Sequence, residues 1–181
     1  QHWSSAASDV YKRQPKRGII YVDTLSRALS ELKPESKTVF KKNAEIYKNK
    51  LLEIDEDFSL FLNTLKKNQK YLVSCEGAFT YLTNDYGLKE AYLWPVNAES
   101  QITPKRMAKV ISLVKTNDIP AVFCESTVSS ESQLAVARET GAKFGGNFFV
   151  DSLSEKNGPA SSYIDLLNHN LNLIKQAYST K

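Results

Sequence analysis

The chain has 181 residues, of which 41% are hydrophobic and 24% are charged, an ordinary balance for a soluble globular protein. The formal net charge is +4, and the basic residues are scattered among acidic ones. This mild, mixed charge argues against a nucleic-acid-binding protein, which usually concentrates basic residues on one face. No apolar run approaches the roughly 20 residues that are needed to cross a bilayer.

Residues 1–14 (QHWSSAASDVYKRQ) show neither helical nor strand periodicity. They lack the basic start and the apolar stretch of a signal peptide, and the chain does not begin with Met. We interpret this segment as a non-native leader joined to a real reading frame. It is left out of the fold prediction, and His2 within it is given no role.

Two helices are predicted between residues 15 and 66. Apolar residues from Ile19 to Leu32 recur at helical spacing, which predicts a helix within residues 15–35. Residues 36–65 contain neither Gly nor Pro and keep one apolar side, which predicts a single long helix. About thirty residues at about 1.5 Å each span roughly 45 Å, more than the diameter of a small domain. We therefore expect residues 36–66 to connect or brace two bodies; a long helix of a bundle is the alternative.

Residues 67–181 alternate between short apolar runs and amphipathic stretches. The runs predict strands at 71–75, 91–94, 121–124 and 144–150, and the stretches predict helices at 78–86, 103–117, 130–140 and 161–178. Such alternation is typical of an α/β fold with a mostly parallel sheet of four strands flanked by helices.

Three acidic residues stand where predicted strands end: Glu76, Glu125 and Asp151. In parallel sheets, ligands gather outside the carboxyl ends of the strands. Carboxylates that meet there repel each other unless a cation or an array of donors compensates them, and a divalent metal ion would do so. Each acid could instead favour a helix N-terminus or cap a turn. Spacing alone leaves both interpretations open.

The other reactive residues do not indicate catalysis. His169 lies in the last predicted helix without neighbours that would complete a ligand set, so we interpret it as a surface or core residue. The sequence has no phosphate-binding glycine loop and no arrangement of nucleophile and His, and we expect no enzyme. Cys75 and Cys124 each end a predicted strand just before a Glu. They could form a disulfide or remain two buried thiols.

Five ordered motifs resemble the metal-binding receptors of bacterial ABC importers, which are manganese- and zinc-binding lipoproteins and periplasmic proteins. The motifs are Cys-Glu-Gly-Ala-Phe at 75–79, Tyr-Leu-Trp-Pro-Val-Asn-Ala-Glu at 92–99, Thr-Pro-Lys at 103–105, Phe-Cys-Glu-Ser-Thr-Val at 123–128 and Phe-Val-Asp-Ser-Leu at 149–153. The resemblance extends from about Pro15 to Tyr178. The paired cysteines make it closest to the cyanobacterial-type manganese receptors.

The resemblance implies a two-lobed protein whose lobes are joined by one long helix, here residues 36–66, with residues 67–181 as the C-terminal lobe. Two His of the N-terminal lobe and two acids of the C-terminal lobe hold the metal in that family. The resemblance assigns these acids to Glu76 and Asp151, places Glu125 behind them as a supporting residue, and favours a disulfide between Cys75 and Cys124. Residues 15–35 would be the last helix of the N-terminal lobe.

The rest of that lobe is expected to be missing, so the chain lacks both His ligands and should bind metal weakly. Two acids with two imidazoles favour Mn²⁺, with Fe²⁺ and Zn²⁺ as alternatives. The resemblance further implies a monomer in the periplasm or on the outer face of the cytoplasmic membrane, with a membrane permease as its partner. An adhesin-type surface protein and a metal-dependent α/β hydrolase fragment are the other functions considered.

Overall fold

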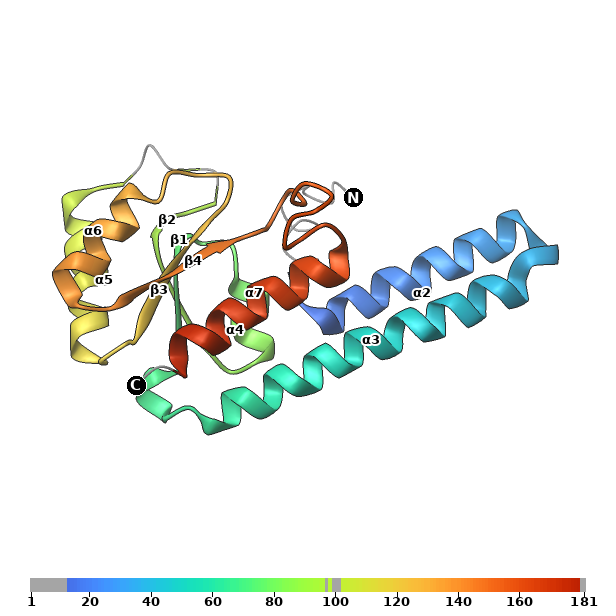
Figure 1. The fold of residues 1–181 in the computed structure, drawn as a ribbon, viewed down its shortest axis with the longest axis horizontal. Helices are drawn as coiled ribbons and strands as arrows, with labels where there is room; N and C mark the ends of the chain where they lie inside the picture. Colours follow the sequence, from blue (N-terminus) through green and yellow to red (C-terminus); the bar gives the residue numbers. More distant parts are fainter. Residues whose placement is uncertain (1–12, 97, 99–101, 180–181) are drawn as a thin grey trace, which may run out of the picture.

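A helical arm projects from an α/β lobe in the computed structural model, which describes residues 13–96, 98 and 102–179 (Figure 1). Most of the expected leader, His2 included, lies outside the described residues, as do Asn97 and Glu99 of the second motif.

The arm consists of α2 (Pro15–Leu32) and α3 (Lys37–Thr64), which lie side by side and are joined by a 3₁₀ turn at Pro34–Ser36 (Figure 1). Pro15 occupies the first helical position, where its missing N–H leaves no helical bond unmade. Helix α3 runs unbroken over 28 residues, as predicted, which corresponds to about 42 Å. Its role as a connection between two lobes stays a prediction.

The lobe follows the predicted alternation of strands and helices. After a 3₁₀ turn at Lys67–Gln69 come β1 (Tyr71–Glu76), α4 (Thr80–Asp85), β2 (Lys89–Trp94), α5 (Pro104–Thr116), β3 (Ala121–Glu125), α6 (Glu131–Thr140), β4 (Lys143–Phe148) and α7 (Tyr163–Tyr178). Helices α5 and α6 lie on one side of the strands, and α4 and α7 lie on the other (Figure 1). The predicted α/β class with parallel strands is confirmed.

The strands pair in twos rather than in one continuous ladder. β1 pairs in parallel with β2, and β3 pairs in parallel with β4. β1 and β3 lie against each other, and the buried side chain of Gln133 on α6 joins them. Its Nε2 donates to the carbonyl of Val73 on β1 at 3.3 Å and to that of Phe123 on β3 at 2.9 Å. A side-chain amide thus satisfies carbonyls where main-chain bonds between the pairs were expected.

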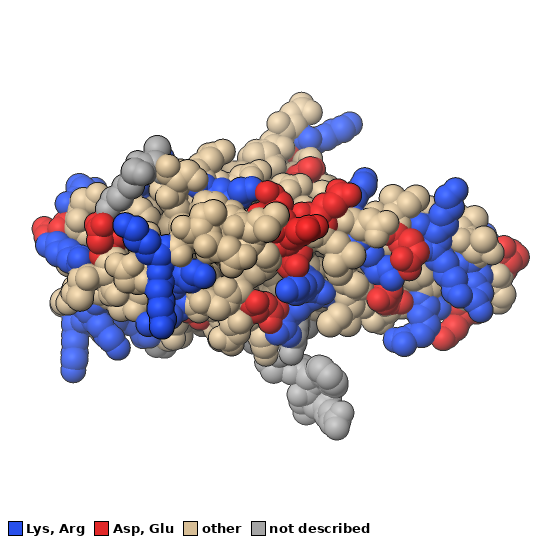
Figure 2. All heavy atoms as spheres, turned by 90° about the horizontal axis from the view of Figure 1, so that it is seen from below, with Lys and Arg blue, Asp and Glu red and all other residues tan. Residues whose placement is uncertain are grey.

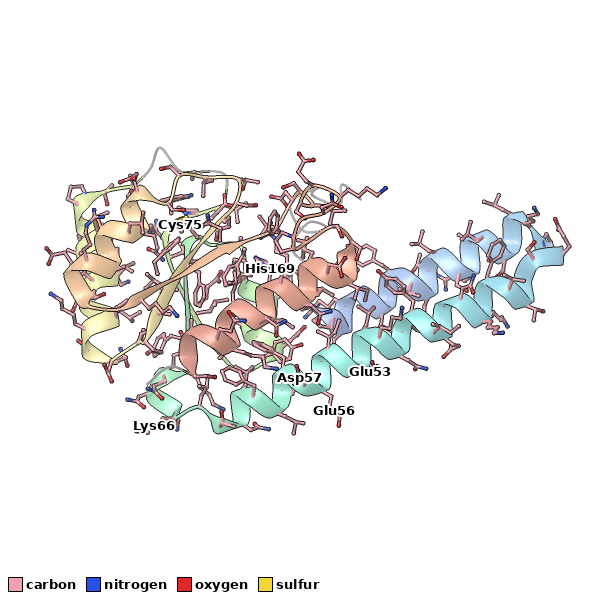
Figure 3. All side chains as sticks on the ribbon, viewed as in Figure 1. Glu53, Glu56, Asp57, Lys66, Cys75 and His169 are labelled. Carbon is pink, nitrogen blue, oxygen red and sulfur yellow. A yellow bond between two sulfur atoms is a disulfide. The ribbon has the colours of Figure 1, made fainter. Side chains whose placement is uncertain are left out.

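Aromatic side chains fill the space between the strands and α7. The rings of Phe123 and Phe148 stack with centroids 4.7 Å apart, and both residues are fully buried. The close fit explains Gly145, because a Cβ at that position would come within 2.2 Å of the Phe123 ring. An ion pair between Lys175 on α7 and Asp57 on α3, the latter labelled in Figure 3, fastens the arm to the lobe at 2.6 Å.

Surface charge remains mixed in the folded chain. Figure 2 shows Lys and Arg together with Asp and Glu along the whole length of one face, as expected for solvated helices. Among the described residues, no helix combines the length and the apolarity that a membrane crossing requires.

Candidate metal centre

The ends of β1 and β3 are joined covalently. Cys75 and Cys124 form a disulfide, with their Cα atoms 4.7 Å apart, so the bridge expected from the resemblance is present. Both residues are fully buried, and Figure 3 shows Cys75 within the lobe. Because each cysteine directly precedes a glutamate, the bridge holds Glu76 and Glu125 next to each other at one edge of the lobe.

Glu125 is completely buried and supports the main chain of Glu76. Its Oε2 accepts the Glu76 N–H at 3.1 Å, while its Oε1 is buried without a hydrogen-bond partner among the described residues. Burial, and after it the nearby carboxylate of Glu76, raises the pKa of Glu125 to about 8. At neutral pH this side chain is therefore mainly protonated, so it adds little negative charge to the site.

A different acid, Glu90, bonds to the start of the helix that follows Glu76. The carboxylate of Glu90, on β2, accepts the N–H of Phe79 at 2.8 Å and the hydroxyl of Thr80 at 2.7 Å, where α4 begins. The buried Glu76 is instead fixed through its main chain, since its carbonyl accepts the hydroxyl of Ser74 at 2.7 Å. Glu90, a residue that sequence reasoning did not single out, therefore bonds to the start of α4, and the helix-terminus role considered for Glu76 stays an open alternative.

Asp151 does not directly follow a strand, contrary to the sequence prediction. β4 ends at Phe148, and the main chain of Phe149 turns to α7, where it exchanges two hydrogen bonds with the side chain of Asn170 at 2.9 and 2.7 Å. A side chain thus takes the place of the neighbouring strand. Asp151 lies two residues after Phe149, in a bend, and has 45% of its side chain exposed, whereas Glu76 is buried.

Arg13 contributes a cation that the sequence analysis excluded with the leader. Only 3% of its side chain is exposed. One guanidinium nitrogen donates to the carbonyl of Ala78, and the other lies 3.2 Å from Oδ1 of Asp151. The guanidinium carbon also lies 5.8 Å from the centre of the Phe79 ring. Arg13 therefore links the segment after Glu76 to Asp151.

Gln14, the other described residue of the expected leader, is also buried, and its Nε2 donates to Asp85 at 2.9 Å. The only sequence signal for either contact was a pair of polar residues directly before a helix that begins with Pro. That signal is too weak to predict burial.

Other possible ligands lie elsewhere or are already bonded. In the described ranges, the one group of three His, Cys or acidic residues with ligand atoms within 4.8 Å of one another is Cys75, Cys124 and Glu125. Its two sulfur atoms form the disulfide, so they have no thiolate to offer a metal. His169 lies on α7 (Figure 3), where its Nε2 is 3.3 Å from the carbonyl of Asn147, and it belongs to no group of three candidate ligands among the described residues. Neither Glu76 nor Asp151 belongs to the group that contains the disulfide, so their role as a ligand pair stays a prediction.

Comparisons with known proteins place the chain in a family. Residues 13–177 match the family described as the periplasmic zinc-uptake complex component A, ZnuA. The iron-binding protein YfeA of Yersinia pestis is 40% identical over 164 residues, which are 91% of this chain and 53% of that protein. The manganese ABC transporter substrate-binding lipoprotein PsaA of Streptococcus mitis is 29% identical over 161 residues, 89% of this chain and 52% of the relative. The chain thus spans about half the length of the curated relatives it matches.

Solved structures share the fold. A Mn-bound periplasmic metal-binding protein of Candidatus Liberibacter asiaticus superimposes with a TM-score of 0.83 at 32% identity. The match covers 92% of this chain and 61% of that one. The periplasmic zinc-binding protein TroA of Treponema pallidum, at 21% identity and a TM-score of 0.82, supports the fold alone.

Proposed function

The chain belongs to the ZnuA family of metal-binding substrate-binding proteins, and we propose that it supplies two carboxylate ligands, Glu76 and Asp151, to a divalent metal ion carried to an ABC importer. The observation that carries the proposal is the placement of Glu76. It is buried at the end of β1, next to the Cys75–Cys124 bridge, and its N–H is accepted by the carboxyl group of Glu125. A carboxylate held in this way at the carboxyl end of a parallel strand is placed to bind a cation.

The disulfide and Glu125 support a ligand role for Glu76. A metal ligand must be held in one orientation by groups behind it. Glu76 has this support, because the Glu125 carboxyl accepts its N–H and the Cys75–Cys124 bridge ties its strand to the next one. Burial raises the pKa of Glu125, which favours the neutral form of this carboxyl group beside Glu76.

Two carboxylates leave a metal ion with most of its coordination positions open. Mn²⁺ and similar cations take more ligands than two side chains provide. We propose that two His of a further lobe, outside these 181 residues, complete the site, and that residues 36–66 join the two lobes. Binding by the 181-residue chain itself should then be weak, since water must fill the remaining positions.

The metal is proposed to be Mn²⁺, with Fe²⁺ and Zn²⁺ as alternatives. A set that includes two hard carboxylate oxygens suits manganese or ferrous iron better than an imidazole-rich set would. The names of the relatives support this range, because they specify manganese for the Streptococcus mitis lipoprotein and iron for the Yersinia pestis protein.

The partner is proposed to be the membrane permease of an importer, with the receptor acting as a monomer in the periplasm or on the outer face of the cytoplasmic membrane. The relatives named above are binding proteins and lipoproteins rather than enzymes. A hydrolase is not favoured, and an adhesin role stays a sequence-based prediction without an observation in its favour.

Weak binding can be located by NMR, because paramagnetic Mn²⁺ broadens the resonances of nuclei close to it. Substoichiometric Mn²⁺ should broaden the amide resonances of residues 76–79 and 151–153 first. Glu76→Gln and Asp151→Asn should each abolish this selective broadening. Glu155→Gln, which alters an exposed acid in the loop after β4, is the matched control and should leave it unchanged. Broadening that spreads evenly over the surface acids would contradict the assignment.

Calorimetry tests the missing ligands separately. The 181-residue chain should show little heat of binding with Mn²⁺. Tight one-to-one binding by this chain would contradict the proposal that another lobe supplies two ligands. In a protein that contains both lobes, Glu76→Ala and Asp151→Ala should each reduce the Mn²⁺ affinity strongly, and Glu125→Ala should reduce it about 10–100-fold, as changes behind a ligand do.

A further inference from the structure

The edge of the lobe opposite Glu76 carries a cluster of lysines. The disulfide joins the carboxyl ends of β1 and β3, and each of these strands has a parallel partner, so all four strands begin at the opposite edge. Lysines stand at the start of β2 and β4, directly before β1, and in the segment that leads into β1. We call these five residues the lysine edge: Lys66, Lys67, Lys70, Lys89 and Lys143.

The lysine edge runs across the starts of the strands. The N–H of Lys89 donates to the carbonyl of Lys70 at 2.9 Å, and the N–H of Lys143 donates to the carbonyl of Pro120, just before β3, at 2.8 Å. The side chain of Lys89 is positioned by Tyr71, whose hydroxyl lies 3.3 Å from its Nζ and whose ring centre lies 5.1 Å from it. Figure 2, which views the molecule from below and so onto this edge, shows Lys and Arg gathered over the lobe.

Ion pairs within the described part of the chain do not neutralise the lysine edge. None of its five lysines forms an ion pair with a described acid, whereas Lys48 and Lys175 elsewhere in the chain do. The turns beside the edge hold Asp118 and Glu139, and Glu139 already lies 3.8 Å from Lys115. Like charges that share one edge repel each other, and a negatively charged partner relieves this repulsion.

The chemistry of the lysine edge fits a membrane surface better than a protein partner. All five residues are Lys, a point charge on a flexible stem, rather than Arg, whose planar fork recognises fixed carboxylates. Lysines close to a membrane are attracted by anionic headgroups. No described residue from 66 to 150 is an exposed large hydrophobic side chain, so this edge has no apolar anchor of the kind that dominates protein interfaces.

We propose that the lysine edge binds anionic lipid headgroups and holds the lobe against the outer face of the membrane. This inference rests on the proposed function only for its location, at or near that membrane. Lys70 and Glu76 lie at opposite ends of β1, about 20 Å apart along an extended strand. Contact through the lysine edge therefore leaves the metal edge facing the medium from which the metal is captured.

The test is co-sedimentation of the 181-residue chain, in EDTA, with vesicles of phosphatidylcholine alone or mixed with phosphatidylglycerol. Binding should require phosphatidylglycerol and should weaken as the salt concentration rises. Lys66→Gln/Lys67→Gln should weaken it about tenfold or more. The matched control, Lys41→Gln/Lys42→Gln, removes two adjacent exposed lysines of the arm and should stay within about threefold of the parent. Equal binding to both kinds of vesicle, or equal losses in the two variants, would overturn the proposal.

Two further measurements test the surface and the partner. Lys89→Gln/Lys143→Gln removes charges from two other segments of the lysine edge and should also weaken binding about tenfold; unchanged binding would overturn the assignment to this edge. In anionic bicelles that contain a gadolinium-chelating lipid, the amide resonances of residues 66–70 should broaden before those of residues 76–79, and the reverse order would refute the orientation. Binding to soluble poly-glutamate without binding to the anionic vesicles would indicate an acidic protein partner and overturn the membrane assignment.

Failure of this inference can be told apart from failure of the metal proposal, because the vesicle assay contains no free metal and the Mn²⁺ titration contains no lipid. If Mn²⁺ selectively broadens residues 76–79 and 151–153 but the anionic vesicles bind nothing, only the lysine edge proposal fails. If the vesicles bind through the lysine edge and Mn²⁺ produces no selective broadening, the ligand assignment fails and the membrane contact stands.

Discussion

Removal of the disulfide should lower the free energy of unfolding of the lobe, by an amount that depends on how far apart the two cysteines are in the sequence. Cys75 and Cys124 are 49 residues apart in the sequence, so the bridge closes a loop of about 50 residues. The entropy that such a cross-link removes from the unfolded chain corresponds to about 4 kcal/mol at 25 °C. This is a large part of the total free energy of unfolding of an ordinary domain, about 5–15 kcal/mol.

The measurement is urea unfolding followed by circular dichroism in three samples: the oxidised parent, the parent in reducing agent, and Cys75→Ala/Cys124→Ala. We expect both samples without the bridge to lose about 2–4 kcal/mol of unfolding free energy. Their slopes against urea should also increase, because an unbridged unfolded chain exposes more surface. The reduced parent keeps its sulfur atoms, so it separates the cross-link from the lost packing of the alanine variant. A reduced parent as stable as the oxidised one would refute the reasoning.

Three further changes test the fold around the site. Burial raises the pKa of Glu125 to about 8 from 4.5, so the folded chain keeps a proton that the unfolded chain loses. The free energy of unfolding of the metal-free parent should therefore fall by roughly 1.4 kcal/mol per pH unit as the pH rises from about 5 to about 8. In urea titrations, Glu125→Gln should remove this fall. Asn170→Leu leaves the main chain of Phe149 without both partners and should cost about 1–3 kcal/mol by thermal unfolding, whereas the same change at exposed Asn168 should cost little. Phe58→Ala, at a fully buried position of α3, should cost about 3–5 kcal/mol by urea unfolding if the arm and the lobe share one core.

Elements with a long and uninterrupted pattern could be predicted from the sequence. The absence of Gly and Pro from residues 37–64, together with one apolar side, was sufficient for α3. Thr103 followed by Pro104 predicted the start of α5, and the Thr103 hydroxyl does accept the N–H of Arg106 there. These features depend on contacts between residues close in sequence, which a sequence pattern displays directly.

Features that depend on distant polar side chains could not be predicted. β4 ends early because Asn170 on α7 bonds to Phe149, and β1 and β3 are joined through Gln133 on α6. In the sequence, these two residues look like ordinary polar positions of amphipathic helices. Their partners become visible only once the helices are packed against the strands.

Arg13 could not be predicted for a different reason. The irregular residues around it gave no sign that a single guanidinium would be buried against the carbonyl of Ala78, 65 residues away. Burial of an arginine depends on whether acceptors converge around it, and neither periodicity nor composition reports that.

The two proposed ligands differ in how firmly the fold holds them. Glu76 is buried at the end of a strand, next to a disulfide and above a carboxyl group that binds its main chain. Asp151 is exposed in a bend, two residues beyond the hydrogen bonds that anchor Phe149. If both carry the metal as proposed, Glu76 contributes the fixed geometry, and Asp151 contributes a charge that can adjust its position. An adjustable carboxylate suits cations that accept variable oxygen coordination.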